Sequence, residues 1–231
     1  MTNYMKSLLF ITSCLTLGTG YSQTCNNWFP FSNGAEFEMT FYTKKDKMTS
    51  RAFYQVEDVK RNGNNYSCDL KAKIYDKKDE EVSEFTFSVT CENGVYKADI
   101  SNFMNPALKE SMASLQLEIT GNDLEIPSRL SVGQNLPDAH TDMTAQSGPI
   151  KINMRVDVLN RKVDDKVNLS TPMGSLSCYK ISSTQKVKMP LINRENQVMD
   201  FYSEGYGNVR SEFLDKNGEL DSYMVMTHFK K

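Results

Sequence analysis

The chain has 231 residues, of which 24% are charged and 39% hydrophobic, and its formal net charge is −2. Charges of both signs alternate without a basic or acidic block, so composition predicts neither nucleic acid nor an anionic membrane surface as a partner. The length suits one all-β domain that buries a sizeable core.

The first 22 residues have the layout of a secretory signal peptide. Lys6 is their only charge, an apolar run follows from 8 to 17, and small and polar residues close the segment at 20–22. The apolar run is about half the roughly 20 residues that a membrane span needs. We therefore expect cleavage near Ser22 or Gln23, export to the periplasm or cell envelope, and no transmembrane segment in the mature chain.

Cys14 offers a second interpretation of this segment. Residues 11–14 read Ile-Thr-Ser-Cys, which fits the lipobox of a bacterial lipoprotein. Only about five apolar residues precede Cys14, however, whereas the apolar region of a signal peptide usually has about 7–15. Lipidation at Cys14 is therefore the less favoured alternative.

Residues 23–231 are expected to form a single β-rich domain. Apolar and polar residues alternate over 37–41, 66–74 and 150–158, which is the pattern of half-buried strands. Because side chains two apart on a strand share a face, each set covers a core. The pattern predicts an antiparallel meander of hairpins.

Three turn segments between these strands are alike in sequence. They cover 43–48, 76–82 and 215–220, and each is rich in lysine and acidic residues. Asn217-Gly218 in the last of them is a strong hairpin signal that predicts a type I′ turn. The lysines and acids are expected at solvated loop tips.

The middle of the chain breaks the pattern. Pro106 is suited to the first position of a helix, so we expect one short helix over 106–113. The stretch 122–148 lacks strong periodicity, and we expect a long connection with one short strand. It would join an N-terminal half, 23–121, to a C-terminal half, 149–231.

The turn at 79–80 predicts a strand register that involves two cysteines. As a two-residue turn it places Leu70 opposite Val89 and, on the same face, Cys68 opposite Cys91. Opposed residues at a non-hydrogen-bonded site lie about 4.5 Å apart between Cα atoms, near the range for a disulfide. We predict a Cys68–Cys91 disulfide, with two facing buried thiols as the alternative.

Cys25 and Cys178 are the other cysteines left after removal of the signal peptide. Elimination makes them a second candidate pair, although the residues around Cys178 do not keep one face. The connectivity of the four cysteines therefore stays open at this stage.

Residues suited to catalysis are few. The chain has two histidines, His140 and His228, no Gly-x-Ser-x-Gly elbow, and no His or Cys spacing typical of zinc. The turn at 215–220 lacks the glycine and glutamate positions of a calcium loop. We predict no catalytic residue, no metal and no cofactor, and therefore not an enzyme.

The apolar composition is more informative. There are 13 Met, 12 Phe and 11 Tyr, and methionine suits adaptable binding surfaces. The stretch 223–226 is apolar on both faces of its expected strand. One interpretation is a curved sheet around an apolar cavity, and the other is a packed core with methionine as filler.

Four stretches carry a resemblance to a family of small exported proteins of Gram-negative bacteria. They match, in order, the patterns FPxxxG, LSVGQ, TPxGxxxCYKI and WYxxGxGxVxSE, with Phe201 in place of the usual Trp. The matching residues are Phe29-Pro30-Phe31-Ser32-Asn33-Gly34, Leu130-Ser131-Val132-Gly133-Gln134, 171–181 and 201–212.

These stretches resemble the TapB-like group, which is related to a domain of unknown function. The resemblance implies an antiparallel sheet curled into a half-barrel or barrel, the YmcC-like fold, similar to periplasmic half-barrels that handle lipoproteins. It implies no activity, so it assigns no catalytic residue. We expect a non-enzymatic structural or protein-interaction module of the envelope. The alternative is a protein that binds a lipid or other apolar ligand in the concave face of its sheet.

Overall fold

The structure is a computed structural model that describes residues 28–98, 116–147 and 150–231, and every regular element in these ranges is a β-strand. The signal peptide expected at 1–22, with Cys14, and the helix expected at 106–113 lie outside the described residues. The strands are β1 (Glu36–Thr43), β2 (Met48–Asn62), β3 (Asn65–Asp76), β4 (Glu81–Glu92), β5 (Val95–Ala98), β6 (Gln116–Asn122), β7 (Leu124–Pro127), β8 (Ala139–Ser147), β9 (Ile150–Thr171), β10 (Gly174–Met189), β11 (Ile192–Ser203), β12 (Gly207–Leu214) and β13 (Leu220–Lys230).

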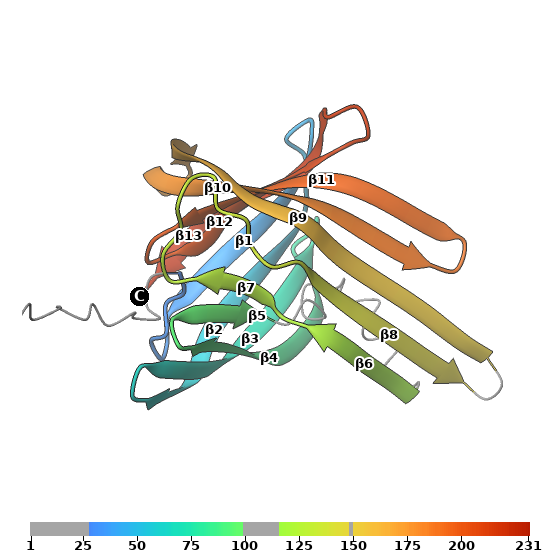
Figure 1. Cartoon of the computed structure of the whole chain (residues 1–231), viewed down its shortest axis with the longest axis horizontal. Coiled ribbons are helices and arrows are strands. Elements are labelled where there is room, and N and C mark those ends of the chain that lie inside the picture. The colour runs from blue at the N-terminus through green and yellow to red at the C-terminus, as the bar shows by residue number, and fades with distance from the viewer. Residues whose placement is uncertain (1–27, 99–115, 148–149) are drawn as a thin grey trace, which may run out of the picture.

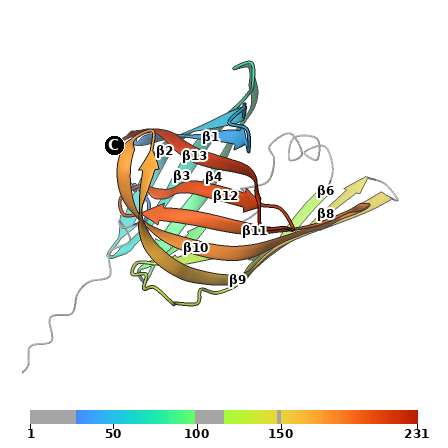
Figure 2. The same cartoon turned by 90° about the horizontal axis from the view of Figure 1, so that it is seen from above.

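The strands form one antiparallel sheet, which confirms the predicted meander (Figure 1). From β1 to β5 and from β8 to β13, each strand lies beside the next one in the chain. β13 also pairs with β1, with Met226 opposite Met39 and Met224 opposite Phe41. The first and last strands therefore meet, and the sheet is strongly curved (Figure 2).

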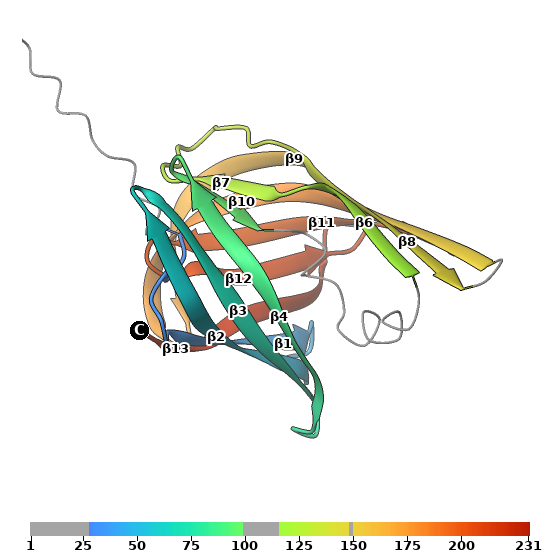
Figure 3. The ribbon, with the colours of Figure 1, turned by 90° about the horizontal axis from the view of Figure 1, so that it is seen from below.

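The two ends of the sheet are consecutive in the chain, which nearly closes the barrel. β6 pairs with β8 and β7 pairs with β5, and only Asp123 separates β6 from β7. The stretch from β6 to β7 thus changes pairing partners and connects the two edges of the sheet (Figure 3). Gly121 lies at this change: a Cβ there would lie 2.2 Å from the backbone oxygen of His140. The predicted barrel is confirmed.

The stretch 122–148 contains more structure than the sequence indicated. β7 is the one short strand expected there, but the nine residues of β8 also belong to it. β8 pairs with both β6 and β9 and so forms part of the barrel wall. The division of the chain into two halves stays a prediction.

The lysine-rich turns noted in the sequence have one shared geometry. In the β3–β4 turn, the Asp76 carboxylate accepts hydrogen bonds from the backbone N–H groups two and four residues later, at 2.8 and 3.1 Å. Asp215 and Thr43 accept the equivalent bonds in their turns. In each turn the residue three positions after the capping one has a positive φ, as Asp79 does at 68°. Each turn is therefore a three-residue loop whose last residue is left-handed.

This geometry corrects two predictions. Gly218 has a positive φ of 79° and Asn217 does not, so the expected type I′ turn at Asn217-Gly218 is wrong. The β3–β4 loop has three residues instead of two, and a β-bulge between Ile74 and Tyr75 changes the pairing again by one residue. The register derived from a two-residue turn at 79–80 is therefore wrong as well.

The corrected register separates the cysteines that were expected to pair. Cys68 lies opposite Val89, and Cys91 lies opposite Tyr66. Cys68 and Cys178 are buried free thiols, so the predicted Cys68–Cys91 and Cys25–Cys178 disulfides are both wrong. Cys91 is itself disulfide-bonded. Cys25 lies outside the described residues.

One end of the barrel, the closed end, holds the segment 28–35 and the turns at 63–64, 93–94 and 204–206. The indole N–H of Trp28 donates to the backbone oxygen of Pro127 at 2.6 Å, and the ring meets Tyr179 edge-on with centroids 5.8 Å apart. Phe29 stacks on Tyr96 at 5.6 Å. The segment before β1 thus fills this end with buried aromatic rings.

The opposite end, the flared end, carries the turns at 43–48, 76–81, 190–191 and 214–219. Because neighbouring strands are antiparallel, alternate turns of the meander come to the same end. At this end β8, β9, β10 and β11 extend beyond the rest of the barrel (Figure 1). The two ends of the barrel therefore differ in both packing and shape.

Candidate functional site

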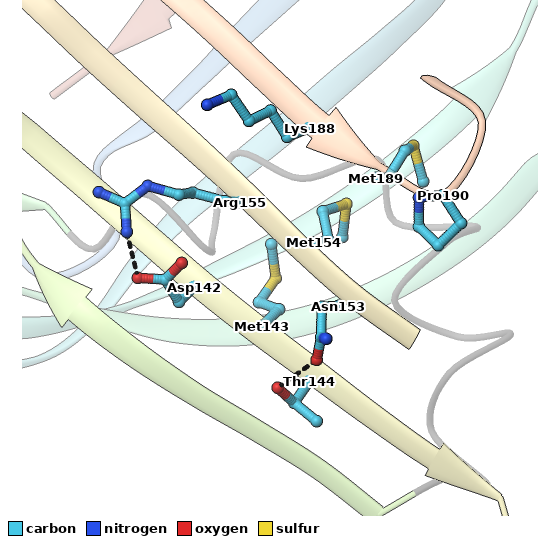
Figure 4. A pocket seen from close by; sticks show the side chains of 9 residues that line it. All are labelled: Asp142, Met143, Thr144, Asn153, Met154, Arg155, Lys188, Met189 and Pro190. Carbon is cyan, nitrogen blue, oxygen red and sulfur yellow. Dashed lines mark hydrogen bonds and ion pairs between the residues drawn. The ribbon is translucent and has the colours of Figure 1, made fainter. Parts of the chain in front are cut away.

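Three methionines from three adjacent strands line an open groove near the flared end (Figure 4). Met143 in β8 lies opposite Met154 in β9, and Met189 ends β10. Pro190 adds to the apolar lining. The groove has a volume of about 450 Å³, which is within the usual range for small-molecule sites. We call it the methionine groove.

The methionines continue the face of the sheet that carries the barrel core. Met143 and Met154 belong to an apolar cluster against which Leu124 packs. Leu124 lies opposite Ala98, which is part of the largest core cluster. Directly opposed residues share a face, so the groove opens on the extension of the core face.

Polar side chains alternate with the methionines along the same strands and also line the groove. Arg155 Nη1 lies 2.7 Å from Asp142 Oδ2, and Arg155 Nε lies 2.8 Å from Asp157 Oδ1. The hydrogen bond with Asp157, followed by that with Asp142, raises the pKa of Arg155. The lining also includes Lys188. Because Arg155 and Lys188 directly neighbour Met154 and Met189 in their strands, their side chains point to the face opposite the methionines.

A second hollow of about 500 Å³ lies at the β1–β2 turn. Its lining combines Phe41 and Tyr223 with Lys44, Lys45 and Lys47. Burial, followed by the hydrogen bond that Tyr223 donates to an aspartate of the turn, raises the pKa of Tyr223 to about 12. This hollow is also open and lies at the flared end.

The curled part of the sheet is filled by side chains over the described residues. Its largest cluster includes Phe37, Met39, Val56, Leu70 and Val89, all less than 9% exposed. This packing favours the earlier interpretation of methionine as core filler within the barrel. The open methionine groove lies outside that packed core.

Two charged groups lie near the closed end, the buried Arg161 and the half-buried Asp200, and no sequence pattern pointed to either. Arg161 is 3% exposed and donates to the backbone oxygens of Glu125 at 3.0 Å and Pro137 at 2.8 Å. Asp200 accepts hydrogen bonds from the Ser211 hydroxyl and the Asn208 amide. Burial raises the pKa of Asp200 and lowers that of Arg161. Arg161 thus ties β9 to the segment that closes the barrel.

The histidines do not form a catalytic group. His140 in β8 has Nε2 3.9 Å from Asp142 Oδ2. His228 in β13 is exposed and lies opposite Glu38, and four strands separate β8 from β13 in the sheet order. Among the described residues, no group of three or more His, Cys, Asp or Glu side chains is placed to hold a metal ion. Asp215 uses its carboxylate to cap a turn.

A comparison with protein families adds the decisive observation. The model of a family described as DUF3108-like matches residues 32–226, most of the chain. The chain belongs to the DUF3108-like family. This membership confirms the predicted relation to a domain of unknown function, and the narrower TapB-like assignment stays a prediction. No protein in the curated collection that was searched matches the chain.

Solved structures confirm the YmcC-like fold for this family member. A protein of Bacteroides fragilis, described as inferred to be exported and as having a YmcC-like fold, is 18% identical with a TM-score of 0.75, covering 90% of this chain and 100% of its own. An inferred lipoprotein of Parabacteroides distasonis is 21% identical with a TM-score of 0.73, covering 89% and 99%. At these identities the likeness shows the fold alone. Over the described ranges, no helix is long and apolar enough to cross a bilayer.

Proposed function

We propose that this DUF3108-like protein is a non-enzymatic binding module exported to the bacterial envelope. The signal-peptide pattern of residues 1–22 supports export. The descriptions of the two structural neighbours as an inferred exported protein and an inferred lipoprotein agree with it. A binding role is favoured because the described hollows are lined by apolar and charged side chains instead of a nucleophile with an adjacent base.

The methionine groove is the binding site that we propose, and its ligand is a single acyl chain or similar apolar molecule. Met143, Met154 and Met189 supply flexible, polarisable walls that adapt to a chain. Arg155 and Lys188 also line this hollow, from the opposite face of the same strands. The observation that carries the proposal is this convergence of three methionines from three strands.

A fluorescent fatty acid such as cis-parinaric acid tests the proposal. The purified protein is expected to bind it with saturation at one molecule per chain. Met189→Glu places a charge in the apolar wall and is expected to weaken binding by about tenfold or more. Met48→Glu is the matched control, because Met48 is an exposed methionine next to the β1–β2 turn. This variant is expected to bind like the parent. Absence of saturable binding, or equal loss in both variants, contradicts a ligand site in this groove.

A protein partner is the second candidate, favoured by unpaired strand edges near the closed end. β9 pairs with β8 or the 134–136 segment only up to Val163, and β10 pairs with β11 only from Cys178 onward. The tip of the β9–β10 hairpin, 164–177, therefore presents both outer edges to an added strand. A photo-crosslinker at Asn168 is expected to trap an envelope protein in intact cells. The same group at Asn193 is the control, and equal labelling from both sites would exclude recognition by the hairpin.

A further inference from the structure

Few large apolar side chains are exposed on this protein. Within the described ranges they are Met48, Val82, Val132, Ile152 and Leu191. Isolated exposed apolar residues are common, so only a member with further unusual features points to an interaction surface.

Leu191 is the extreme member of this set. Its side chain is fully exposed, and its φ is 68°, a left-handed conformation that favours glycine or asparagine. It follows Pro190 at the tip of the β10–β11 hairpin, where Met189 lies opposite Ile192. The chain therefore keeps a strained leucine at the point where it meets solvent. Such strain is characteristic of functional positions.

The cations beside this tip are also free. Between 188 and 194 the sequence has Lys188 and Arg194 and no acidic residue. Over the described residues neither forms a salt bridge, whereas Lys186, further from the tip, pairs with Glu195 at 3.0 Å. The β10–β11 tip thus combines an exposed apolar side chain with two unpaired cations.

We propose that the β10–β11 turn, 189–192, docks on an anionic lipid bilayer by inserting Leu191. Lys188 and Arg194 would meet the phosphate groups of the lipids. An exposed apolar tip flanked by unpaired cations is complementary to an interface that has negative head groups above hydrocarbon. The β3–β4 turn is excluded from this contact because four acids lie around its Val82, from 76 to 81.

The docking turn borders the methionine groove, since Lys188, Met189 and Pro190 line that groove. A docked protein would hold one end of the groove at the membrane surface. The inference does not rest on the proposed function, because bilayer docking needs no ligand in the groove. A negative result for vesicle binding would therefore leave the proposal of fatty-acid binding intact, and the reverse also holds.

Flotation with phosphatidylcholine vesicles, with and without about one-third phosphatidylglycerol, tests the docking. The purified protein is expected to float with the anionic vesicles and much less with the neutral ones. Leu191→Ser is expected to lower the bound fraction by about tenfold. Lys188→Gln combined with Arg194→Gln is expected to remove most of the preference for anionic vesicles and its sensitivity to salt.

Two matched variants control the experiment. Val132→Ser removes an exposed apolar side chain at the other end of the barrel, and Val82→Ser removes one from the acidic turn. Both are expected to float like the parent. Leu191→Asn gives a second loss of the apolar group with a residue that tolerates the positive φ. The proposal is overturned if the parent does not bind anionic vesicles, or if Val132→Ser and Leu191→Ser reduce binding equally.

Discussion

The two ends of the barrel use apolar side chains in opposite ways. At the closed end Trp28 is 2% exposed, and its ring and indole N–H both have partners. At the flared end Leu191 is fully exposed and strained, and Lys188 has no acidic partner among the described residues. Side chains of the closed end increase the stability of the fold. The unpartnered side chains of the flared end cannot, so another molecule is the natural explanation for them.

This comparison implies that stability and binding are separable by mutation. The closed end brings together residues from the N-terminal segment, β7, β10 and β11. Changes there should alter the free energy of unfolding. The turns of the flared end are capped from within, as by Asp76 and Asp215, and their bonds to other strands, such as Arg51 to Asp79 and Tyr223 to Asp46, are exposed. Changes there should alter binding and leave stability nearly constant.

The largest effect is expected for Trp28→Ala. The substitution removes a fully buried indole from between β7 and β10 and leaves a cavity, and such changes cost about 3–5 kcal/mol. Denaturation in urea should show this loss in the free energy of unfolding. Leu191→Ser is the control from the other end and should change it by less than about 0.5 kcal/mol. A loss below about 1 kcal/mol for Trp28→Ala would mean that the closed end does not stabilise the barrel.

Gly207→Ala should come next. Gly207 has a φ of 85°, and a Cβ there would lie 2.5 Å from the backbone oxygen of Trp28. The left-handed conformation alone costs alanine about 1 kcal/mol, and the contact should add at least about as much again. Gly63→Ala is the matched control, since its φ is 60° but no atom lies within 4 Å of its Cβ position. If chemical denaturation shows equal losses of unfolding free energy for the two variants, the backbone at Trp28 moves away from the new Cβ at no free-energy cost.

The two regions should also respond oppositely to pH. Burial raises the pKa of Asp200 above its ordinary value of 3.8. The folded state then holds this proton more tightly than the unfolded state, so stability from this group falls as pH rises from about 4 through the folded pKa. Asp200→Asn should remove that fall. Free energies of unfolding measured across this range, as the difference between parent and variant, test the sign.

Asp215 at the flared end provides the opposite case. Backbone N–H groups of its own turn, first that of Glu219 and then that of Asn217, lower the pKa of its carboxyl. Its contribution to stability is therefore present above pH about 4 and is lost as pH falls through the folded pKa. Asp215→Asn should lose stability mainly above pH about 4. A fall of the same sign for both residues would contradict the contrast between buried and turn carboxylates.

The sequence predicted the features that have a local cause. Alternation over 66–74 and 150–158 marked β3 and β9, and the lysine-rich turns marked the β1–β2, β3–β4 and β12–β13 hairpins. The register of β3 and β4 could not be predicted in the same way, because a three-residue loop and a bulge at Val82 are decided by backbone geometry. The cysteine pairing depended on that register and was wrong with it. β8 escaped notice because its buried side chains are small or polar except for Met143.

The candidate surfaces have no local signature at all. Met143, Met154 and Met189 come from three strands, and only the methionine content hinted at a groove. Lys188 and Lys45 are far apart in the chain and reach the same end because alternate turns of a meander share one end. Which turns share an end is a property of topology, so composition alone gave no reason to expect a membrane surface as a partner.

The smallest expected effect on stability is that of Leu191→Asn, and this substitution separates stability from binding. Leucine at a φ of 68° costs about 1 kcal/mol relative to a residue that accepts the left-handed region. Leu191→Asn should therefore raise the free energy of unfolding by about 0.5–1 kcal/mol in urea denaturation, while it lowers the fraction bound to anionic vesicles. A substitution that stabilises the protein and weakens its docking would show that this leucine is kept for contact with another molecule. A loss of stability would instead mean that Leu191 contributes to packing in the fold. The proposed division between a stabilising closed end and a binding flared end would then be wrong for Leu191.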